Sequence, residues 1–162
     1  MLNIKIICVG KIREKATKDL LAEYEKRISK YAKLETIELD DEKIPGNASE
    51  AIEEQVKIAE SNKIIEKLNK YQNAHVCLLD LHGKEYTSEE YAKKIEDIST
   101  YSSSTIIFVI GGSLGMSQEL LNYSQDKICF SKMTFPHQLM RLFLLEQTFR
   151  AFKIINNEVY HK

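Results

Sequence analysis

Cysteine is scarce in this sequence, and the few cysteines do not form a metal-binding pattern. Cys8, Cys77 and Cys129 lie far apart, each within an apolar run. Such positions predict buried, reduced thiols rather than a disulfide or a metal site. The first ten residues lack the cleavage pattern of a secretory signal, and an odd cysteine count without such a signal is typical of a reducing compartment. We therefore expect a cytoplasmic protein that binds no metal.

Long hydrophobic runs and a strong charge of either sign are absent as well. Residues 98–118 carry no charged side chain, but only residues 106–110 are continuously apolar. A membrane-spanning helix needs roughly 20 apolar residues in succession, so none is expected. The net charge is −1, which is not typical of a general nucleic-acid binder. Acids dominate residues 40–60 and bases dominate residues 131–162, so we expect any anion to bind near the C-terminal fifth.

The pattern of apolar residues predicts one α/β domain over residues 1–162. Hydrophobic residues make up 43% of the chain, and no linker or repeat divides it. The expected strands are residues 3–9, 34–39, 75–79, 104–110 and 127–130, and the expected helices are residues 14–31, 48–70, 87–98, 117–123 and 136–156. Asn47 with Glu50, and Thr87 with Glu90, resemble helix starts. Alternating strands and helices predict a mostly parallel sheet covered by helices on both faces.

The last predicted helix is apolar on more than one face. Because such a helix must be buried on both sides, a second copy of the chain is a plausible cover, and we expect a dimer. Arg141 and Arg150 lie on different faces of this helix. An arginine in such a helix is more often part of an ion pair, for example with Glu146, than a substrate clamp.

Two loops after strands are candidates for ligand binding. Residues 111–115, Gly-Gly-Ser-Leu-Gly, let a backbone approach a ligand closely, but they fit a tight turn equally well. No Lys-Ser/Thr follows, so this is not a phosphate loop. Residues 130–137 contain Ser, Thr and Met, which suit a ligand with polar and apolar parts, although a simple connector is the alternative.

The chain ends in Tyr160, His161 and Lys162. Terminal residues usually fray, and a disordered tail is the simplest interpretation. An aromatic ring, an imidazole and a cation in succession would also suit stacking on, and hydrogen bonding to, an unstacked RNA base.

Four stretches in this order resemble one family along essentially the whole chain. They are KIICVGKI, LLDLHGKEYTSEEYA, FVIGGSLGM, and FSKMTFPHQLMRLFLLEQTFRAFKI with the final YHK. The sequence is similar to the pseudouridine N3-methyltransferases of 23S rRNA, small members of the SPOUT class of knotted methyltransferases.

The resemblance implies a C-terminal deep trefoil knot, a homodimer and S-adenosylmethionine as cofactor. It implies methylation of ring nitrogen 3 of a pseudouridine on the assembled ribosome, in the 70S particle or the large subunit. The matching cofactor-binding positions are Leu79, Gly111, Phe130, Ser131, Lys132, Met133, Thr134 and Phe135. Tyr160 and His161 would reach the partner subunit's cofactor and help to place the base.

One departure limits the transfer of roles. Some family members carry Pro-Glu where this chain has Ser113-Leu114, so an acidic role there is not transferred. His161, or a neighbouring group such as Arg141, is expected to help the target nitrogen lose its proton or to stabilise the negative charge that results, and Tyr160 to stack on the base or orient it. Two alternatives are a nucleotide-binding α/β protein and a ribosome-binding factor without catalytic activity.

Overall fold

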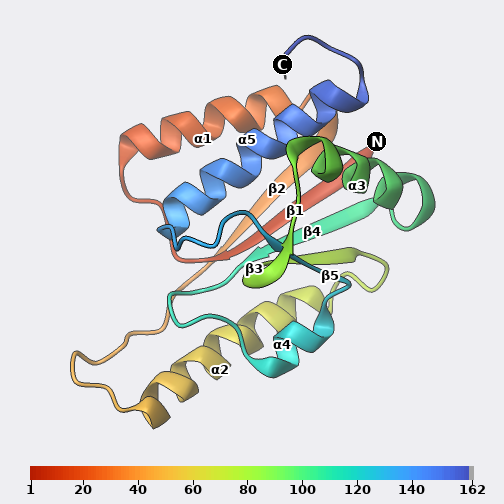
Figure 1. Cartoon of the computed structure of the whole chain (residues 1–162). Coiled ribbons are helices and arrows are strands. Elements are labelled where there is room, and N and C mark those ends of the chain that lie inside the picture. Colours follow the sequence, from red (N-terminus) through yellow and green to blue (C-terminus); the bar gives the residue numbers. More distant parts are fainter. Residues whose placement is uncertain (161–162) are drawn as a thin grey trace.

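A five-stranded, all-parallel sheet forms the centre of the computed structural model, which describes residues 1–160 (Figure 1). Its strands are β1 (Leu2–Val9), β2 (Ala32–Leu39), β3 (His75–Glu85), β4 (Thr105–Ile110) and β5 (Asp126–Cys129). The strand order is β2-β1-β4-β3-β5, and every neighbouring pair is parallel. The predicted parallel α/β architecture is therefore confirmed.

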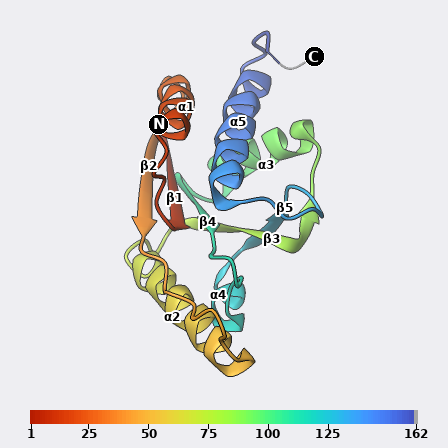
Figure 2. The same cartoon turned by 90° about the vertical axis from the view of Figure 1, so that its left-hand side faces the viewer.

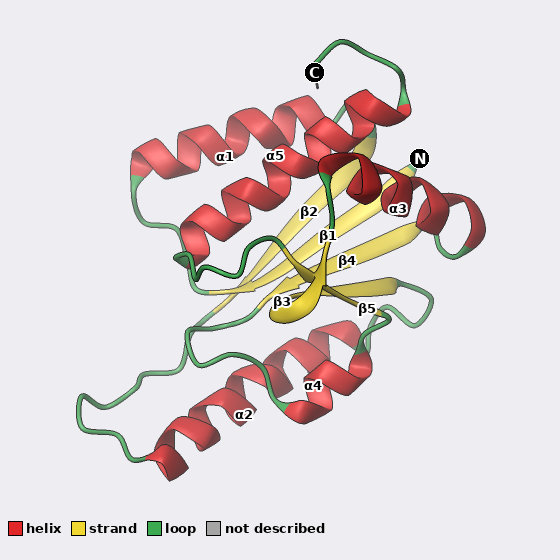
Figure 3. Cartoon of the chain, in the orientation of Figure 1, coloured by secondary structure: helices red, strands yellow, loops and turns green. Residues whose placement is uncertain are grey.

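Helices cover both faces of the sheet, as predicted (Figures 1, 2 and 3). They are α1 (Lys15–Ile28), α2 (Glu50–Leu68), α3 (Ser88–Tyr101), α4 (Gln118–Tyr123) and α5 (His137–Ile155). On one face α5 packs between α1 and α3, and on the other α2 packs against α4. None of the helices within residues 1–160 is both long and apolar enough to cross a membrane.

Strand β4 joins the two halves of the core because its side chains alternate between them. Ile106 and Phe108 face the cluster under α1, α3 and α5, while Ile107 and Val109 face the cluster under α2 and α4. All four are fully buried, and each contributes about 2 kcal/mol relative to an exposed side chain. This central strand fixes the position of the loop that follows Ile110.

The main difference from the sequence prediction lies in β3, which continues to Glu85 instead of ending at Leu79. Its pairing with β5 is interrupted between Leu79 and Lys84, so that residues 80–83 bulge out of the ladder. Gly83 packs against the backbone of β5, since a Cβ atom there would lie 2.6 Å from the carbonyl carbon of Lys127. The polar residues in this segment suggested a loop, because pairing with β5 cannot be seen from local periodicity.

The helix starts were predicted with mixed success. Thr87 and Glu90 form the expected capping box at α3. Helix α2 is capped by Ser49, whose hydroxyl accepts a hydrogen bond from the Ile52 N–H, rather than by Asn47. The difference of two residues is usual for a helix start in a polar loop.

Candidate functional site

The carboxyl ends of β4 and β5 and the bulge in β3 meet at one edge of the sheet and surround a cavity of about 660 Å³. Parallel strands place their carboxyl ends together, where connecting loops form ligand sites. Here the bulge after Leu79, the loop after Ile110 and the loop after Cys129 form the walls, and His137 and Met140 of α5 close one side. Both loops singled out from the sequence therefore line the same cavity.

Seven of the eight predicted cofactor-binding residues line this cavity. They are Leu79, Gly111, Phe130, Ser131, Met133, Thr134 and Phe135. Lys132 is not among the lining residues, because its side chain is 85% exposed and its ammonium lies 3.8 Å from the Glu85 carboxylate. The structure brings together residues about 50 positions apart along the chain, and their role in binding stays a prediction.

The glycine loop, residues 111–115, is both a tight turn and a wall of the cavity. The Gly115 N–H donates to the Gly112 carbonyl oxygen over 3.0 Å, and Gly115 has a φ of 87°, a conformation that favours glycine. A Cβ atom at Gly111 would lie only 2.8 Å from Cγ of Met116. The sequence left open whether residues 111–115 form a tight turn or a ligand-binding loop, and the structure shows a tight turn that also lines the cavity.

The second loop presents backbone and apolar groups. The Ser131 hydroxyl accepts a hydrogen bond from the Met133 N–H over 3.0 Å, while the Met133 side chain is 73% exposed. Phe130 is anchored edge-to-face on Tyr91 of α3, with ring centroids 6.0 Å apart. The loop can therefore offer a ligand a fixed aromatic wall and a movable thioether.

Few permanent charges line the cavity. Among its lining residues within 1–160, Asp80 and Lys127 are the charged side chains, and His82 and His137 are titratable. His137 Nδ1 lies 3.2 Å from the Val9 carbonyl oxygen, which can only accept, so this nitrogen carries the proton. A lining with one acid and one base suits a polyphosphate poorly and suits a ligand that carries both charges better.

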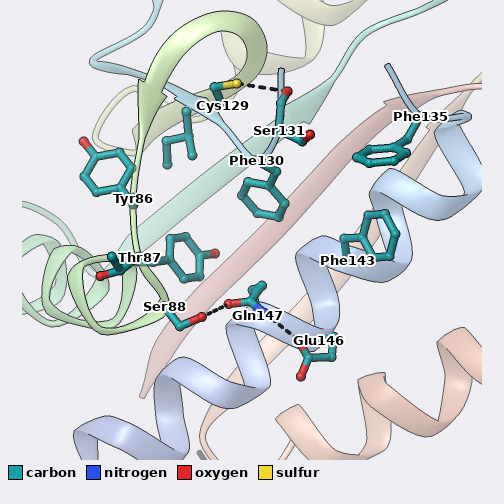
Figure 4. A pocket seen from close by; sticks show the side chains of 12 residues that line it. Tyr86, Thr87, Ser88, Cys129, Phe130, Ser131, Phe135, Phe143, Glu146 and Gln147 are labelled. Atoms are coloured by element: carbon teal, nitrogen blue, oxygen red, sulfur yellow. Dashed lines mark hydrogen bonds between the residues drawn. The ribbon is translucent and has the colours of Figure 1, made fainter. Parts of the chain in front are cut away.

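A second cavity of about 380 Å³ adjoins the first, between α3 and α5 (Figure 4). The two cavities share Ile128, Phe130, Ser131 and Phe135. Polar side chains form one side of it: the Ser88 hydroxyl donates to Gln147 over 2.6 Å, and the Gln147 amide donates to Glu146 over 2.7 Å. Sequence reasoning missed this cavity, since its walls come from α3 and α5, which are 50 residues apart.

Neither Tyr160 nor Arg141, the two predicted catalytic residues that the structure describes, lines the larger cavity. Tyr160 folds back on α5, with its hydroxyl 3.3 Å from Glu146 Oε1 and its ring 5.0 Å from that of Phe149. It is therefore packed, rather than frayed, within its own subunit. His161 lies outside the described residues.

Arg141 is 8% exposed and is not among the residues that line either cavity. Its Nη1 donates to Glu38 of β2 over 2.7 Å, and its buried Nε has no hydrogen-bond partner among the described residues. The expected ion pair with Glu146 belongs to Arg150, whose Nε donates to Glu146 Oε1 over 3.0 Å. A catalytic role for Arg141 stays a prediction.

Another polar cluster lies at the opposite edge of the sheet. One possible ligand atom each from His75, Cys77 and Asp126 lies within 4.8 Å of the others. Lys94 already contacts the Asp126 carboxylate over 2.6 Å, and burial raises the pKa of the Cys77 thiol to about 12. Both features oppose cation binding, because a metal needs a free carboxylate and a thiolate.

Comparison with known proteins gives the family. The model of a family described as "Predicted SPOUT methyltransferase" matches residues 2–161. The chain belongs to this family. The resemblance noted from the sequence is thereby confirmed, and the shared edge of β3, β4 and β5 becomes the site to test for methyl-donor binding.

Curated relatives match over the same extent. A protein of Clostridium perfringens (strain SM101 / Type A) named "Ribosomal RNA large subunit methyltransferase H 1" is 54% identical over 161 residues, which cover 99% of this chain and 100% of the relative. Proteins named "Ribosomal RNA large subunit methyltransferase H" from Clostridium novyi (strain NT) and Bacillus thuringiensis (strain Al Hakam) are 53% and 51% identical, with the same coverage. Similarity of this extent covers both loops and the last helix.

Proposed function

We propose that this SPOUT methyltransferase transfers a methyl group from S-adenosylmethionine to ring nitrogen 3 of a pseudouridine in 23S rRNA, within the assembled ribosome. The observation that carries the proposal is the single cavity formed by the glycine loop and the Ser/Thr/Met loop. The names of the relatives, all large-subunit rRNA methyltransferases, support the RNA substrate. A ribosomal substrate places the protein in the cytoplasm.

The lining of the cavity fits S-adenosylmethionine. Leu79 and Phe130 provide apolar walls for an adenine ring, and the loop at Gly111 leaves backbone groups accessible to it. Ser131 and Thr134 add hydroxyl groups. The balanced charge of the lining suits a ligand that carries both a carboxylate and cationic groups. The bound cofactor would supply an activated methyl group, so the protein must align the acceptor and help it lose a proton.

We assign the orientation and deprotonation of the target base, which accepts the methyl group, to residues at the end of the chain. In the transfer, the target nitrogen gains the methyl group and loses its proton. His161 would take up that proton or, like Arg141, stabilise the negative charge of the base, and Tyr160 would orient the base. Tyr160 contacts Glu146, which lines the second cavity, so the tail starts next to the paired cavities.

We further infer a homodimer and a C-terminal trefoil knot. Exposed apolar side chains gather on and before α5, where Met133, Leu139 and Phe143 are 73%, 42% and 36% exposed. A partner subunit that covers them would bring its own tail to this cavity. Membership of the SPOUT family supports the knot, and the close packing of Gly83 on β5 is compatible with a chain threaded at this point.

Mass spectrometry of rRNA from cells with and without the gene tests the reaction directly. Loss of one methyl group from a pseudouridine in the absence of the gene is the expected result. An unchanged modification pattern would instead favour a ribosome-binding factor without catalytic activity. Calorimetry with S-adenosylmethionine, ATP and NAD separates the proposal from a nucleotide-binding protein, because only the first ligand should bind.

Deletion of Tyr160–Lys162 tests the assignment of the tail. The truncated protein should fold and bind S-adenosylmethionine, because the cavity is lined by residues 79–140. It should transfer no methyl group. Full activity of the truncated protein would refute the catalytic roles of Tyr160 and His161.

A further inference from the structure

Helix α2 carries two consecutive buried polar residues on the face that also buries Ile64 and Leu68. Glu60 is 4% exposed and Ser61 is 1% exposed. Burial raises the pKa of the Glu60 carboxyl group above its usual range, and the nearby acids Asp41 and Glu42 add to this, opposed by a hydrogen bond from the Glu42 N–H and by His137. A carboxyl group kept at such a site, where its charge is disfavoured, needs a structural or functional reason.

Both residues contact the loop that follows β4, one near each end. The Ser61 hydroxyl accepts a hydrogen bond from the Ser117 N–H over 2.8 Å, at the start of α4. Glu60 lies against Gly112: a Cβ atom at this glycine would collide with Glu60 Oε1 and lie 3.0 Å from Cδ. Glu60 and Ser61 thus contact the segment 112–117 on the side that does not line the larger cavity. The other side of the segment lines that cavity.

Glu60 is itself held in place. Its Oε2 accepts a hydrogen bond from the Glu42 N–H over 3.0 Å, and the Glu42 carboxylate is paired with Lys63 of α2 over 2.7 Å. The carboxyl group therefore forms a fixed surface behind Gly112. The requirement for glycine at this position comes from that contact, whereas Gly115 is required for its backbone conformation.

We propose that Glu60 and Ser61 are positioning residues, which hold the glycine loop in the shape that binds S-adenosylmethionine. This inference rests on the proposed function. Neither residue lines the cavity, so both act through the backbone of residues 112–117. Groups that bind a ligand must be held within about 0.5 Å of the productive geometry, so a displaced loop would bind S-adenosylmethionine less well.

A double-mutant cycle tests the contact, with S-adenosylmethionine affinity measured by calorimetry on the full chain. Gly112→Ala should weaken binding by ~10-fold or more, because the new methyl group must displace either Glu60 or the loop. In a Glu60→Ala background the same change should cost less than ~2-fold, since the space behind residue 112 is then free. Glu53→Ala, at an exposed acid of the same helix, should leave the cost of Gly112→Ala unchanged.

Two further variants separate positioning from general damage. Glu60→Gln keeps the shape and an oxygen acceptor for Glu42, so it should bind S-adenosylmethionine within ~3-fold of the natural protein, yet remain sensitive to Gly112→Ala. Ser61→Ala should weaken binding by ~5-fold, because the Ser117 N–H loses its buried partner. Thermal unfolding of each variant establishes that it is folded.

The results distinguish this inference from the proposed function. If the natural protein binds S-adenosylmethionine but the effects of Glu60→Ala and Gly112→Ala are additive, the inference is overturned and the proposed function stands. If the natural protein does not bind S-adenosylmethionine at all, the proposed function fails and the inference fails with it.

Discussion

The pKa values of several ionisable side chains in this protein are set by burial and by the groups that they contact. Burial raises the pKa of Cys8 to about 11 and that of Cys77 to about 12, so both thiols are protonated and unreactive near neutral pH. All three cysteines are buried, as their apolar runs predicted. Glu38 shows the opposite result: partial burial alone would raise its pKa, but the hydrogen bond and charge of Arg141 outweigh it and lower the pKa.

A pH-dependent contribution to stability is expected from Asp126. Partial burial on its own would raise the pKa of Asp126, but hydrogen bonds from Lys94 and His75 hold it below the usual range. A depressed pKa means that the carboxylate stabilises the fold above the usual Asp pKa and that this contribution is lost as the pH falls through the lowered value. Asp126→Asn should lower the free energy of unfolding by about 1 kcal/mol at pH 7.

The difference between Asp126→Asn and the natural protein should begin to shrink below about pH 4, the usual Asp pKa, and disappear below the lowered pKa, where the natural carboxyl group is neutral in the folded protein as well. Denaturant unfolding over a pH series measures it. Asp97→Asn is the control, since the side chains of Asp97 and its partner Lys93 are 46% and 67% exposed, and it should change stability much less than Asp126→Asn does. A constant difference at all pH values would contradict the assignment.

At the scale of elements, the sequence predicted the regular parts and missed the contacts between distant segments. Continuous apolar runs located β1 and β4, because strands buried on both faces leave that pattern. Strand β3 was cut short at Leu79, since the polar residues beyond it pair with β5, about 45 residues away. Glu60 and Ser61 were missed for the same reason: on a polar helix, nothing local marks the residues that meet Gly112 and Ser117.

The packing of β3 on β5 predicts a strong effect of Gly83→Ala. A Cβ atom at this glycine would lie 2.6–2.8 Å from backbone atoms of Lys127 and Ile128, which cannot move aside as a side chain would. The variant should lose about 2 kcal/mol of stability, by the overpacking that such insertions cause. It should also bind S-adenosylmethionine more weakly, because residues 80–82 line the cavity.

Gly46→Ala is the matched control, since a Cβ atom there has no neighbour within 4 Å. Its stability should stay within about 0.5 kcal/mol of the natural protein. Chemical denaturation and calorimetry on both variants give the comparison. Equal stability of Gly83→Ala and Gly46→Ala would mean that the bulge moves freely relative to β5.

At the scale of the whole molecule, two apolar-to-lysine variants test the proposed dimer. Leu139 on α5 and Ile58 on α2 are both 42% exposed, but they lie in layers on opposite faces of the sheet. We expect the natural protein and Ile58→Lys to sediment as dimers. Leu139→Lys should shift the protein toward monomers, because an interface core excludes an unpaired charge. Dimers of equal stability in both variants would place the interface elsewhere.

The distribution of charge over the molecule predicts which form of the substrate is used. With a net charge of −1, the protein lacks the strong positive charge of a general nucleic-acid binder, and even in residues 131–162 bases outnumber acids only by five to two. Binding to naked RNA depends on neutralised phosphates and weakens steeply with salt, so affinity must come largely from the shape of the ribosome.

We expect methylation of 70S particles or large subunits to be at least ~10-fold faster than that of an rRNA hairpin with the same pseudouridine. Transfer of radioactive methyl groups at 50 and 200 mM salt measures both rates, and the hairpin rate should fall more with salt. Equal rates on ribosomes and hairpins would show that the RNA sequence alone is recognised.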